Sequence, residues 1–163
     1  MLSLERLHTD HATALLAFET ENRAYFARSV PDRGDAYFET FVFRHQSLLD
    51  EQRTGQCHFH VVLDQDGQLV GRVNLVDAAD GGAELGYRIG QRFAGRGLAT
   101  EAVAAACRLA AGRYGLSRLF ALVTLDNPAS RAVLLRNGFD RAGDTVVEGR
   151  AAERFERELA ATG

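Results

Sequence analysis

Lysine and tryptophan are absent from this sequence of 163 residues, and cysteine, proline and methionine are scarce. Without lysine, the chain cannot carry the phosphate-binding P-loop, whose motif ends in Gly-Lys-Ser or Gly-Lys-Thr. Cys57 and Cys107 are too few and too far apart for a disulfide framework or a cysteine zinc site. We expect both thiols to be reduced and buried.

Long apolar segments are also missing. No apolar run approaches the roughly 18 residues that a membrane-spanning helix needs. The first residues do not join a charged segment to an apolar stretch, so no signal peptide is expected. The formal net charge of −3 disfavours a dedicated nucleic-acid-binding protein, which usually has a basic face. These absences predict a cytoplasmic protein without a membrane or nucleic-acid partner.

Helix and strand signals alternate through the first part of the chain. Residues 2–7 alternate apolar and polar, which predicts a strand. Asp10 is placed to cap a first helix and Asp35 a second, which Gly55 ends. The second helix should bury one apolar side, formed by Phe38, Phe41, Val42, Leu48 and Leu49.

A hairpin signal follows. Apolar, β-branched residues 57–63 and 69–75 flank an Asp-Gly turn at Asp66 and Gly67, and residues 84–89 predict a third strand. His58 and His60 share one face of the first of these strands. Because no third ligand accompanies them, we interpret them as a half-buried pair and not as a metal site.

The second part of the chain predicts a helix over 98–114, a strand over 119–125, a helix capped by Asn127 with Pro128 in its first position, and a strand over 139–147. The composition of residues 149–159 favours a helix, but a hairpin partner for the preceding strand is equally compatible. This order predicts a mixed sheet with helices on its faces.

A glycine-rich, basic segment over residues 90–97 is the strongest candidate for a binding site. Gly95 and Gly97 allow positive φ and close approach of a ligand to the backbone. The first turn of the next helix has unpaired N–H groups, and its dipole adds positive potential. With Arg92 and Arg96 alongside, the segment predicts a diphosphate-binding loop.

Two alternatives compete for this loop. The dinucleotide-binding fingerprint requires glycine or alanine where this chain has Thr100, and an acidic residue about 20 positions further on. Residues 115–120 offer no acidic residue, which disfavours that site. The other alternative is a strand–helix connection without any ligand, since many helix N-termini bind nothing.

Several motifs together resemble a known family. Arg92 to Gly97 reads R-x-x-G-x-G, which resembles the acyl-CoA pyrophosphate loop of the GNAT N-acetyltransferases. Residues 127–131 and 136–139 resemble the family's N-x-x-S…N-G-F segment, and residues 84–87 and 97–102 add a third match. Over roughly residues 55–145 the chain is similar to the branch that acetylates N-terminal amines of ribosomal proteins.

The resemblance implies one N-acetyltransferase domain over residues 1–163 with an α/β (α+β) GNAT fold. Its mixed, mostly antiparallel sheet would have about six or seven strands, splayed between the fourth and fifth and flanked by about four helices. Acetyl-CoA would be the co-substrate, no metal is implied, and relatives are monomers or homodimers.

The resemblance also implies a set of cofactor contacts. Pantetheine would pair with the backbone of Tyr87, Arg88 and Ile89, where an N–H near Arg88 or Ile89 would polarise the thioester carbonyl. Asn127 would bond the pantetheine arm or only cap its helix, and Arg136 would reach the adenosine phosphates or lie on a solvated helix face. The diphosphate would contact the N–H groups of Phe93, Ala94, Gly95, Arg96, Gly97, Leu98 and Ala99 and the hydroxyl of Thr100.

Catalytic roles are implied for two side chains. Glu84 would accept the amine proton through water, unless it is only a solvated charge at a strand end. Many members carry a tyrosine that protonates the leaving thiolate, but this chain has Leu134 at that position. Ser130 would then be the nearest substitute. The amine would attack the thioester directly, and Cys107 would be a core residue.

The acceptor is implied only by class. Tyr25, Phe26 and Tyr37 would shape its groove if they are not simply core residues, and Arg23 and Arg28 would attract an acidic acceptor. We expect the N-terminal amine of a protein or peptide. The alternatives are a small amine such as an amino acid, polyamine or antibiotic, or a non-catalytic module that only binds acyl-CoA.

Overall fold

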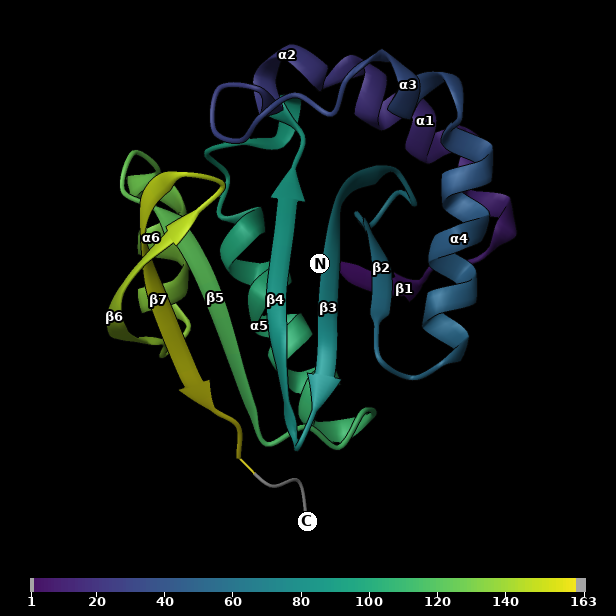
Figure 1. Cartoon of the computed structure of the whole chain (residues 1–163). Helices are drawn as coiled ribbons and strands as arrows, with labels where there is room; N and C mark the ends of the chain where they lie inside the picture. The colour runs from purple at the N-terminus through teal and green to yellow at the C-terminus, as the bar shows by residue number, and fades with distance from the viewer. Residues whose placement is uncertain (1, 161–163) are drawn as a thin grey trace.

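The computed structural model describes residues 2–160 and arranges them around a single seven-stranded sheet (Figure 1). The strand order is β1-β2-β3-β4-β5-β7-β6. All neighbouring strands are antiparallel except β4 and β5, which are parallel. The strands are β1 (Ser3–Arg6), β2 (His58–Leu63), β3 (Leu69–Ala79), β4 (Gly82–Ile89), β5 (Arg118–Thr124), β6 (Asp140–Val147) and β7 (Arg150–Glu158).

Helices cover both faces of this sheet. On one face α1 packs against β3 and α4 against β2, whereas α5 crosses the other face against β1, β3 and β4. Figure 1 shows α1 to α4 gathered around the upper and right-hand rim, with α5 behind the sheet. The helices are α1 (Ala12–Glu21), α2 (Arg23–Phe26), α3 (Asp35–Glu39), α4 (Phe41–Arg53), α5 (Leu98–Gly112) and α6 (Pro128–Arg136), with 3₁₀ turns η1 (Thr9–His11) and η2 (Gln91–Phe93).

The mixed sheet and the hairpin at its centre are confirmed. The Asp64 carboxylate accepts hydrogen bonds from the N–H groups of Asp66 and Gln68, both at 2.9 Å, and Gly67 has φ 78°. Asn127 caps α6 by accepting a hydrogen bond from the N–H of Ser130, with Pro128 in the first position as expected. Local polar chemistry therefore sets these boundaries, as the sequence predicts.

The first helices differ from the expectation. Asp10 lies inside η1, which the His8 side chain caps, so Asp10 does not cap α1. The second predicted helix is broken at Thr40 into α3 and α4, because the backbone there leaves helical geometry. Val42 was expected on the buried side of this helix, but its side chain is 70% exposed. Gly55, with φ 80°, follows the end of α4 as predicted.

Residues 150–158 form strand β7, which settles the alternative left open for the tail. This strand pairs with β5 on one side and β6 on the other. Its Ala152 and Phe155 are almost fully buried. Alanine, glutamate and arginine favour helices in isolation, but sheet pairing on two sides and burial of Phe155 outweigh that propensity.

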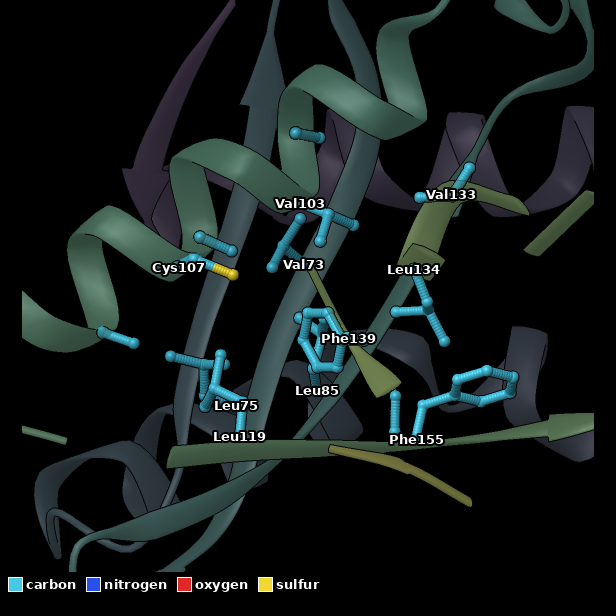
Figure 2. Close-up of a cluster of buried hydrophobic side chains, with 14 of the residues drawn as sticks. Val73, Leu75, Leu85, Val103, Cys107, Leu119, Val133, Leu134, Phe139 and Phe155 are labelled. Atoms are coloured by element: carbon cyan, nitrogen blue, oxygen red, sulfur yellow. The ribbon is translucent and has the colours of Figure 1, made fainter. Parts of the chain in front are cut away.

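The main core lies between the sheet and α5. Figure 2 shows Val73, Leu75, Leu85 and Leu119 beneath Val103 and Cys107, with Leu134, Phe139 and Phe155 beside them. Both cysteines are free and buried, as predicted. Burial raises the pKa of the Cys107 thiol, which keeps it protonated and unreactive. No helix among residues 2–160 is long and apolar enough to cross a membrane.

The parallel pair at the centre of the sheet is short. Strands β4 and β5 are in register only at Gly82–Arg118, Ala83–Leu119 and Glu84–Phe120. Figure 1 shows the two strands close at the lower end and diverging toward the upper end. The splay that the family resemblance implies is therefore present.

The histidine pair of β2 is buried, and its members pack around Tyr114. The His58 ring stacks on Tyr114 with centroids 3.7 Å apart, and His60 Nε2 lies 2.7 Å from the Tyr114 hydroxyl. Burial lowers the pKa of His60 to about 4. The neutral form of His60 is therefore the one that the fold holds.

We predict that acid weakens the fold through His60. Because its folded pKa lies below the ordinary value of 6.5, the unfolded chain takes up the proton first, and stability falls as pH decreases from about 6.5 to 4. The loss should be about 3 kcal/mol in the free energy of unfolding. Urea unfolding at pH 7 and pH 4.5 measures it. His60→Gln should reduce the pH dependence, and equal pH dependence in the wild type and this variant would contradict the prediction.

Candidate active site

The loop between β4 and α5 presents a row of free backbone donors. Gly95 and Gly97 have φ 76° and 75°, and a Cβ at either position would meet no atom within 4 Å. Among residues 2–160, no acceptor bonds the N–H groups of residues 95–100. Six consecutive donors and the dipole of the 15-residue helix α5 make this loop suitable for an anion.

The first two predicted donors are not in this row. The N–H of Phe93 donates to the Gly90 carbonyl at 3.0 Å, and that of Ala94 to the Gln91 carbonyl at 3.2 Å. Both bonds close the 3₁₀ turn η2, and the Phe93 side chain is buried. The expectation that these two N–H groups hold a diphosphate is therefore corrected, and the donor row begins at Gly95.

A cavity of about 560 Å³ extends from this loop along the end of β4 to the start of α6 and to residues 25–30. We call it the splay cavity. The end of β4, the first turn of α5 and the first turns of α6 form its walls. It is lined by Tyr25, Phe26, Arg28, Ser29, Val30, Tyr87, Arg88, Ile89, Phe93, Ala94, Gly95, Gly97, Leu98, Ala99, Thr100, Asn127, Ala129, Ser130, Ala132, Val133 and Arg136.

The edge of β4 offers main-chain groups to this cavity. Gly90 donates its N–H to the Val70 carbonyl of β3 at 2.9 Å. In an antiparallel strand, the N–H and C=O groups of every second residue bond to the same neighbouring strand. Arg88 therefore faces β3 as Gly90 does, whereas Tyr87 and Ile89 direct their N–H and C=O groups toward β5. The geometry favours Ile89 over Arg88 as the donor to a bound carbonyl.

Two hydroxyl groups meet in the splay cavity. The Tyr87 hydroxyl lies 2.6 Å from Ser130 Oγ, so the two side chains share a hydrogen bond. Burial raises the pKa of Tyr87, which keeps the phenol protonated. Leu134, in contrast, is fully buried in the main core (Figure 2). The position where relatives have a tyrosine thus faces the core, and Tyr87 from β4 supplies a phenol from another direction.

Of the arginines predicted to bind the phosphates of the coenzyme, only one lines the splay cavity. Arg136 lines the splay cavity, but Arg92 and Arg96 do not. Arg92 instead pairs with Glu21 of α1 at 2.6 Å and stacks on Phe93. The ion pair turns this guanidinium toward α1, so the loop's positive potential comes mainly from its backbone.

A second cavity, of about 800 Å³, lies on the opposite face of the sheet. We call it the acceptor-side cavity. Tyr87 and Arg88 line both cavities, so the two spaces meet at the end of β4. Tyr37 lines the acceptor-side cavity, whereas Tyr25 and Phe26 line the splay cavity. The three aromatic residues expected in one groove are therefore divided between the two cavities.

A buried ion triad supports the point where the cavities meet. Glu19 of α1 is 2% exposed and binds Arg72 at 3.0 Å and Arg88 at 3.1 Å. Burial lowers the pKa of Arg88, and the Glu19 carboxylate opposes that shift. One carboxylate thus fixes both guanidinium groups of adjacent strands β3 and β4.

Glu84 lies on the same face of β4 as Gly86 and Arg88, two residues before Gly86, but it lines neither cavity. Burial and the nearby Asp77 raise the pKa of its carboxyl group. The structure places it next to the acceptor-side cavity, where a water molecule would have to connect it to an amine. Its role as a base stays a prediction.

The arginines expected to attract an acidic acceptor are not in the acceptor-side cavity. Arg23 pairs with Asp32 and Asp35, each at 2.8 Å, and Arg28 lines the splay cavity. Two other arginines, Arg33 and Arg44, line the acceptor-side cavity instead. No motif marked them, because a loop residue and an exposed helix residue carry no periodic signal.

Sequence reasoning also missed two buried polar residues. Glu19 sits on an apolar helix without any local sign of its partners, which are more than 50 residues away. The Asn137 side chain donates to the carbonyls of Thr100 and Val133 and so joins α5 to α6. Its position immediately before Gly138 is the sequence signal that could have identified Asn137.

One group of possible metal ligands lies away from both cavities. In the described part of the chain, Glu5, His8 and His11 bring ligand atoms within 4.8 Å of one another. Each histidine Nδ1 accepts a backbone N–H, and each Nε2 lies within 3.0 Å of the Glu5 carboxylate. Nε2 is therefore the protonated nitrogen, so this arrangement is explained by hydrogen bonds to Glu5.

Comparisons with known proteins agree with this geometry. A family model described as an acetyltransferase (GNAT) domain matches residues 2–140. A [ribosomal protein uS5]-alanine N-acetyltransferase from Escherichia coli is 27% identical over 148 residues, which cover 87% of this chain and 76% of that protein.

Two solved structures share the fold. A ribosomal L7/L12 α-N-protein acetyltransferase in complex with coenzyme A has a TM-score of 0.87 at 21% identity, covering 99% of this chain and 96% of that one. A spermidine N-acetyltransferase from Vibrio cholerae, solved with CoA and spermine, has a TM-score of 0.79 at 18% identity, covering 97% and 95%.

We predict that Glu19→Gln lowers the free energy of unfolding by about 3–5 kcal/mol, because it leaves two guanidinium groups without their shared carboxylate in a buried site. The matched control is Glu21→Gln, which removes the exposed pair with Arg92 and should cost less than about 1 kcal/mol. Thermal or urea unfolding of both variants measures the difference. Similar losses in the two variants would contradict a special role for the buried triad.

Proposed function

The chain belongs to the acetyltransferase (GNAT) domain family, and from that premise we propose that it transfers the acetyl group of acetyl-CoA to the α-amine of a peptide chain. The observation that carries the proposal is the presence of two sets of main-chain donors at the splay cavity. One set is the open edge of β4 at Tyr87 and Ile89, and the other is the row of free N–H groups of residues 95–100. A long ligand that carries a thioester, then an amide-rich arm and then a diphosphate would meet these donors in the same order.

The donor half of the reaction uses groups on three elements. The arm of the coenzyme would extend along Tyr87 and Ile89 as an added strand, and its diphosphate would lie over Gly95 to Thr100. The cap of α6 uses only the Asn127 side-chain oxygen, so its amide nitrogen is available to the arm. The coenzyme complex of the L7/L12 acetyltransferase, whose fold this chain shares, supports this donor.

The acceptor half uses the other face of the sheet. The amine would enter through the acceptor-side cavity and attack the thioester carbon at the junction formed by Tyr87 and Arg88. Its lone pair forms the new C–N bond, and the N–H of Ile89 would stabilise the oxyanion. A water molecule would pass the amine proton to Glu84. An uncovered Gly86, where a Cβ would meet no atom within 4 Å, leaves space for this water.

The leaving thiolate would take its proton from the Tyr87–Ser130 pair. Ser130 Oγ and the phenol share a hydrogen bond of 2.6 Å at the cavity wall, so a proton lost by one would be replaced by the other, and solvent water would return a proton to the pair after the thiol leaves. A thiol with a parent pKa near 8.5 needs only modest help to leave. Transfer would be direct, because the cysteine thiols are buried.

The names of two relatives support a peptide acceptor. The Escherichia coli relative is named for an alanine of ribosomal protein uS5, and the L7/L12 enzyme is named an α-N-protein acetyltransferase. An α-amine has a pKa near 8 and is partly neutral at physiological pH, so a base in contact with the amine is not required. A peptide terminus also fits a cavity that is open at the protein surface.

We predict that Tyr87→Phe and Ser130→Ala each lower kcat about tenfold, which is less than the roughly hundredfold or larger effects typical of acid–base catalysis because the thiolate leaves readily. Affinity for acetyl-CoA should change little. Thiol release with a short peptide that has a free N-terminus measures kcat, and the same peptide with an acetylated N-terminus is the blank. Ser117→Ala, far from both cavities, is the control. Unchanged kcat in both site variants would remove these residues from the mechanism.

We predict that Glu84→Gln changes the pH profile of kcat/KM. Glu84 accepts a proton only when ionised, and its raised pKa places the loss of activity at a higher pH than for an ordinary glutamate. Activity of the wild type should fall as pH decreases through that pKa. The variant should be slower and should lack this acidic limb. An identical acidic limb in Glu84→Gln would show that another group is the base.

A further inference from the structure

We propose that the acceptor-side cavity selects amines that carry carboxylates, and that its acceptor is a peptide with acidic side chains in its first few positions. The proposal rests on the proposed function, since it assigns the substrate class of that site.

The charge of the cavity comes mainly from Arg33 and Arg44. Their guanidinium carbons lie 4.9 and 5.1 Å from the centroid of the Tyr37 ring. Within residues 2–160 neither arginine has a carboxylate within 4.0 Å or a side-chain hydrogen bond. Two guanidinium groups beside one buried aromatic ring, with their donors unused, are each suited to binding a carboxylate.

The remaining charges do not cancel this pair. Arg72 and Arg88 also line the cavity, and both bind the single carboxylate of Glu19. The lining contributes one more carboxylate, that of Glu51. Four guanidinium groups therefore face two carboxylates, which leaves two positive charges for a ligand to neutralise. A polyamine would meet like charge here, which costs affinity.

The distance between the reacting centre and these arginines indicates which residues of the acceptor peptide would contact them. The cavity extends from Tyr87 on β4 across β3 to Phe59 on β2. Two strand spacings make this span roughly 10 Å, the length of about three extended residues. The Tyr37 hydroxyl lies 3.5 Å from Nη1 of Arg72, which belongs to β3, the strand next to β4. Side chains of the second and third acceptor residues would reach the two arginines beside the Tyr37 ring.

Two further features fit a peptide better than a free amino acid. Asn74, opposite Gly86 in the register, lines the cavity, and its side-chain amide has no hydrogen-bond partner in the described chain, so the amide is available to bond the peptide backbone. At the rim, Phe43 lines the cavity although it is 76% exposed. An apolar side chain at the mouth would contact a chain that continues outward.

The test compares three matched peptides of eight residues, each with an N-terminal alanine, that differ only at positions two and three: Glu-Glu, Gln-Gln or Lys-Lys. Acetyl transfer is followed by thiol release at 50 mM and 300 mM salt, and free glutamate and spermidine are included as acceptors. The variants are Arg33→Gln, Arg44→Gln and the double variant, with Arg108→Gln on α5 as the control.

We expect kcat/KM for Glu-Glu to exceed that for Gln-Gln about tenfold at low salt, with Lys-Lys lowest, and the preference to weaken at high salt. The double variant should lose most of the preference for Glu-Glu over Gln-Gln, and Arg108→Gln should keep it. Equal rates for the three peptides would overturn this inference and leave the proposed function in place. Faster acetylation of spermidine or of free glutamate than of the peptides would overturn both this inference and the proposed function. Acetylation of none of these acceptors would also overturn both.

Discussion

Three residue pairs join β4 to β5, and beyond Glu84 and Phe120 neither strand satisfies the backbone groups of the other. Both strands lie at the centre of the sheet, where an unpaired edge is costly unless something else bonds it. The adjacent α5 begins at the same end of the opening, with its own unpaired N–H groups at Leu98 to Thr100. The fold thus brings two sets of unused donors to one place, and the splay cavity lies between them.

The two faces of the sheet cooperate through a small number of polar contacts. Glu19 holds Arg72 and Arg88 from the acceptor side, and the Tyr87 phenol meets Ser130 on the donor side. Successive residues of β4 point to opposite faces, so Tyr87 and Arg88 serve the donor and acceptor cavities from adjacent positions. A break in the Glu19 triad would loosen the strand that carries both groups. This coupling explains why a charged residue is tolerated in the core.

Much of this organisation could be predicted from the sequence. The hairpin, the glycine loop and the cap of α6 depend on local chemistry at Gly67, Gly97 and Asn127, and each appeared where expected. The break at Thr40 and the strand identity of residues 150–158 could not be predicted, because packing and sheet pairing decide them. The same holds for the site. Backbone donors follow from glycines and helix starts, whereas the Glu19 triad, the Tyr87–Ser130 bond and the arginines around Tyr37 join residues far apart in the chain.

The central claim is that the loop from Gly95 to Thr100 binds the diphosphate of acetyl-CoA, and calorimetric titration of acetyl-CoA tests it most directly. The proteins to compare are the wild type, Gly97→Glu and Gly97→Gln. Gly97 has φ 75° and open space at its Cβ, so both variants carry the same backbone strain and differ only in charge. The account predicts binding by the wild type and by Gly97→Gln, and at least about tenfold weaker binding by Gly97→Glu because its carboxylate repels the diphosphate. No binding by the wild type, or equal affinity of the two variants, would contradict it.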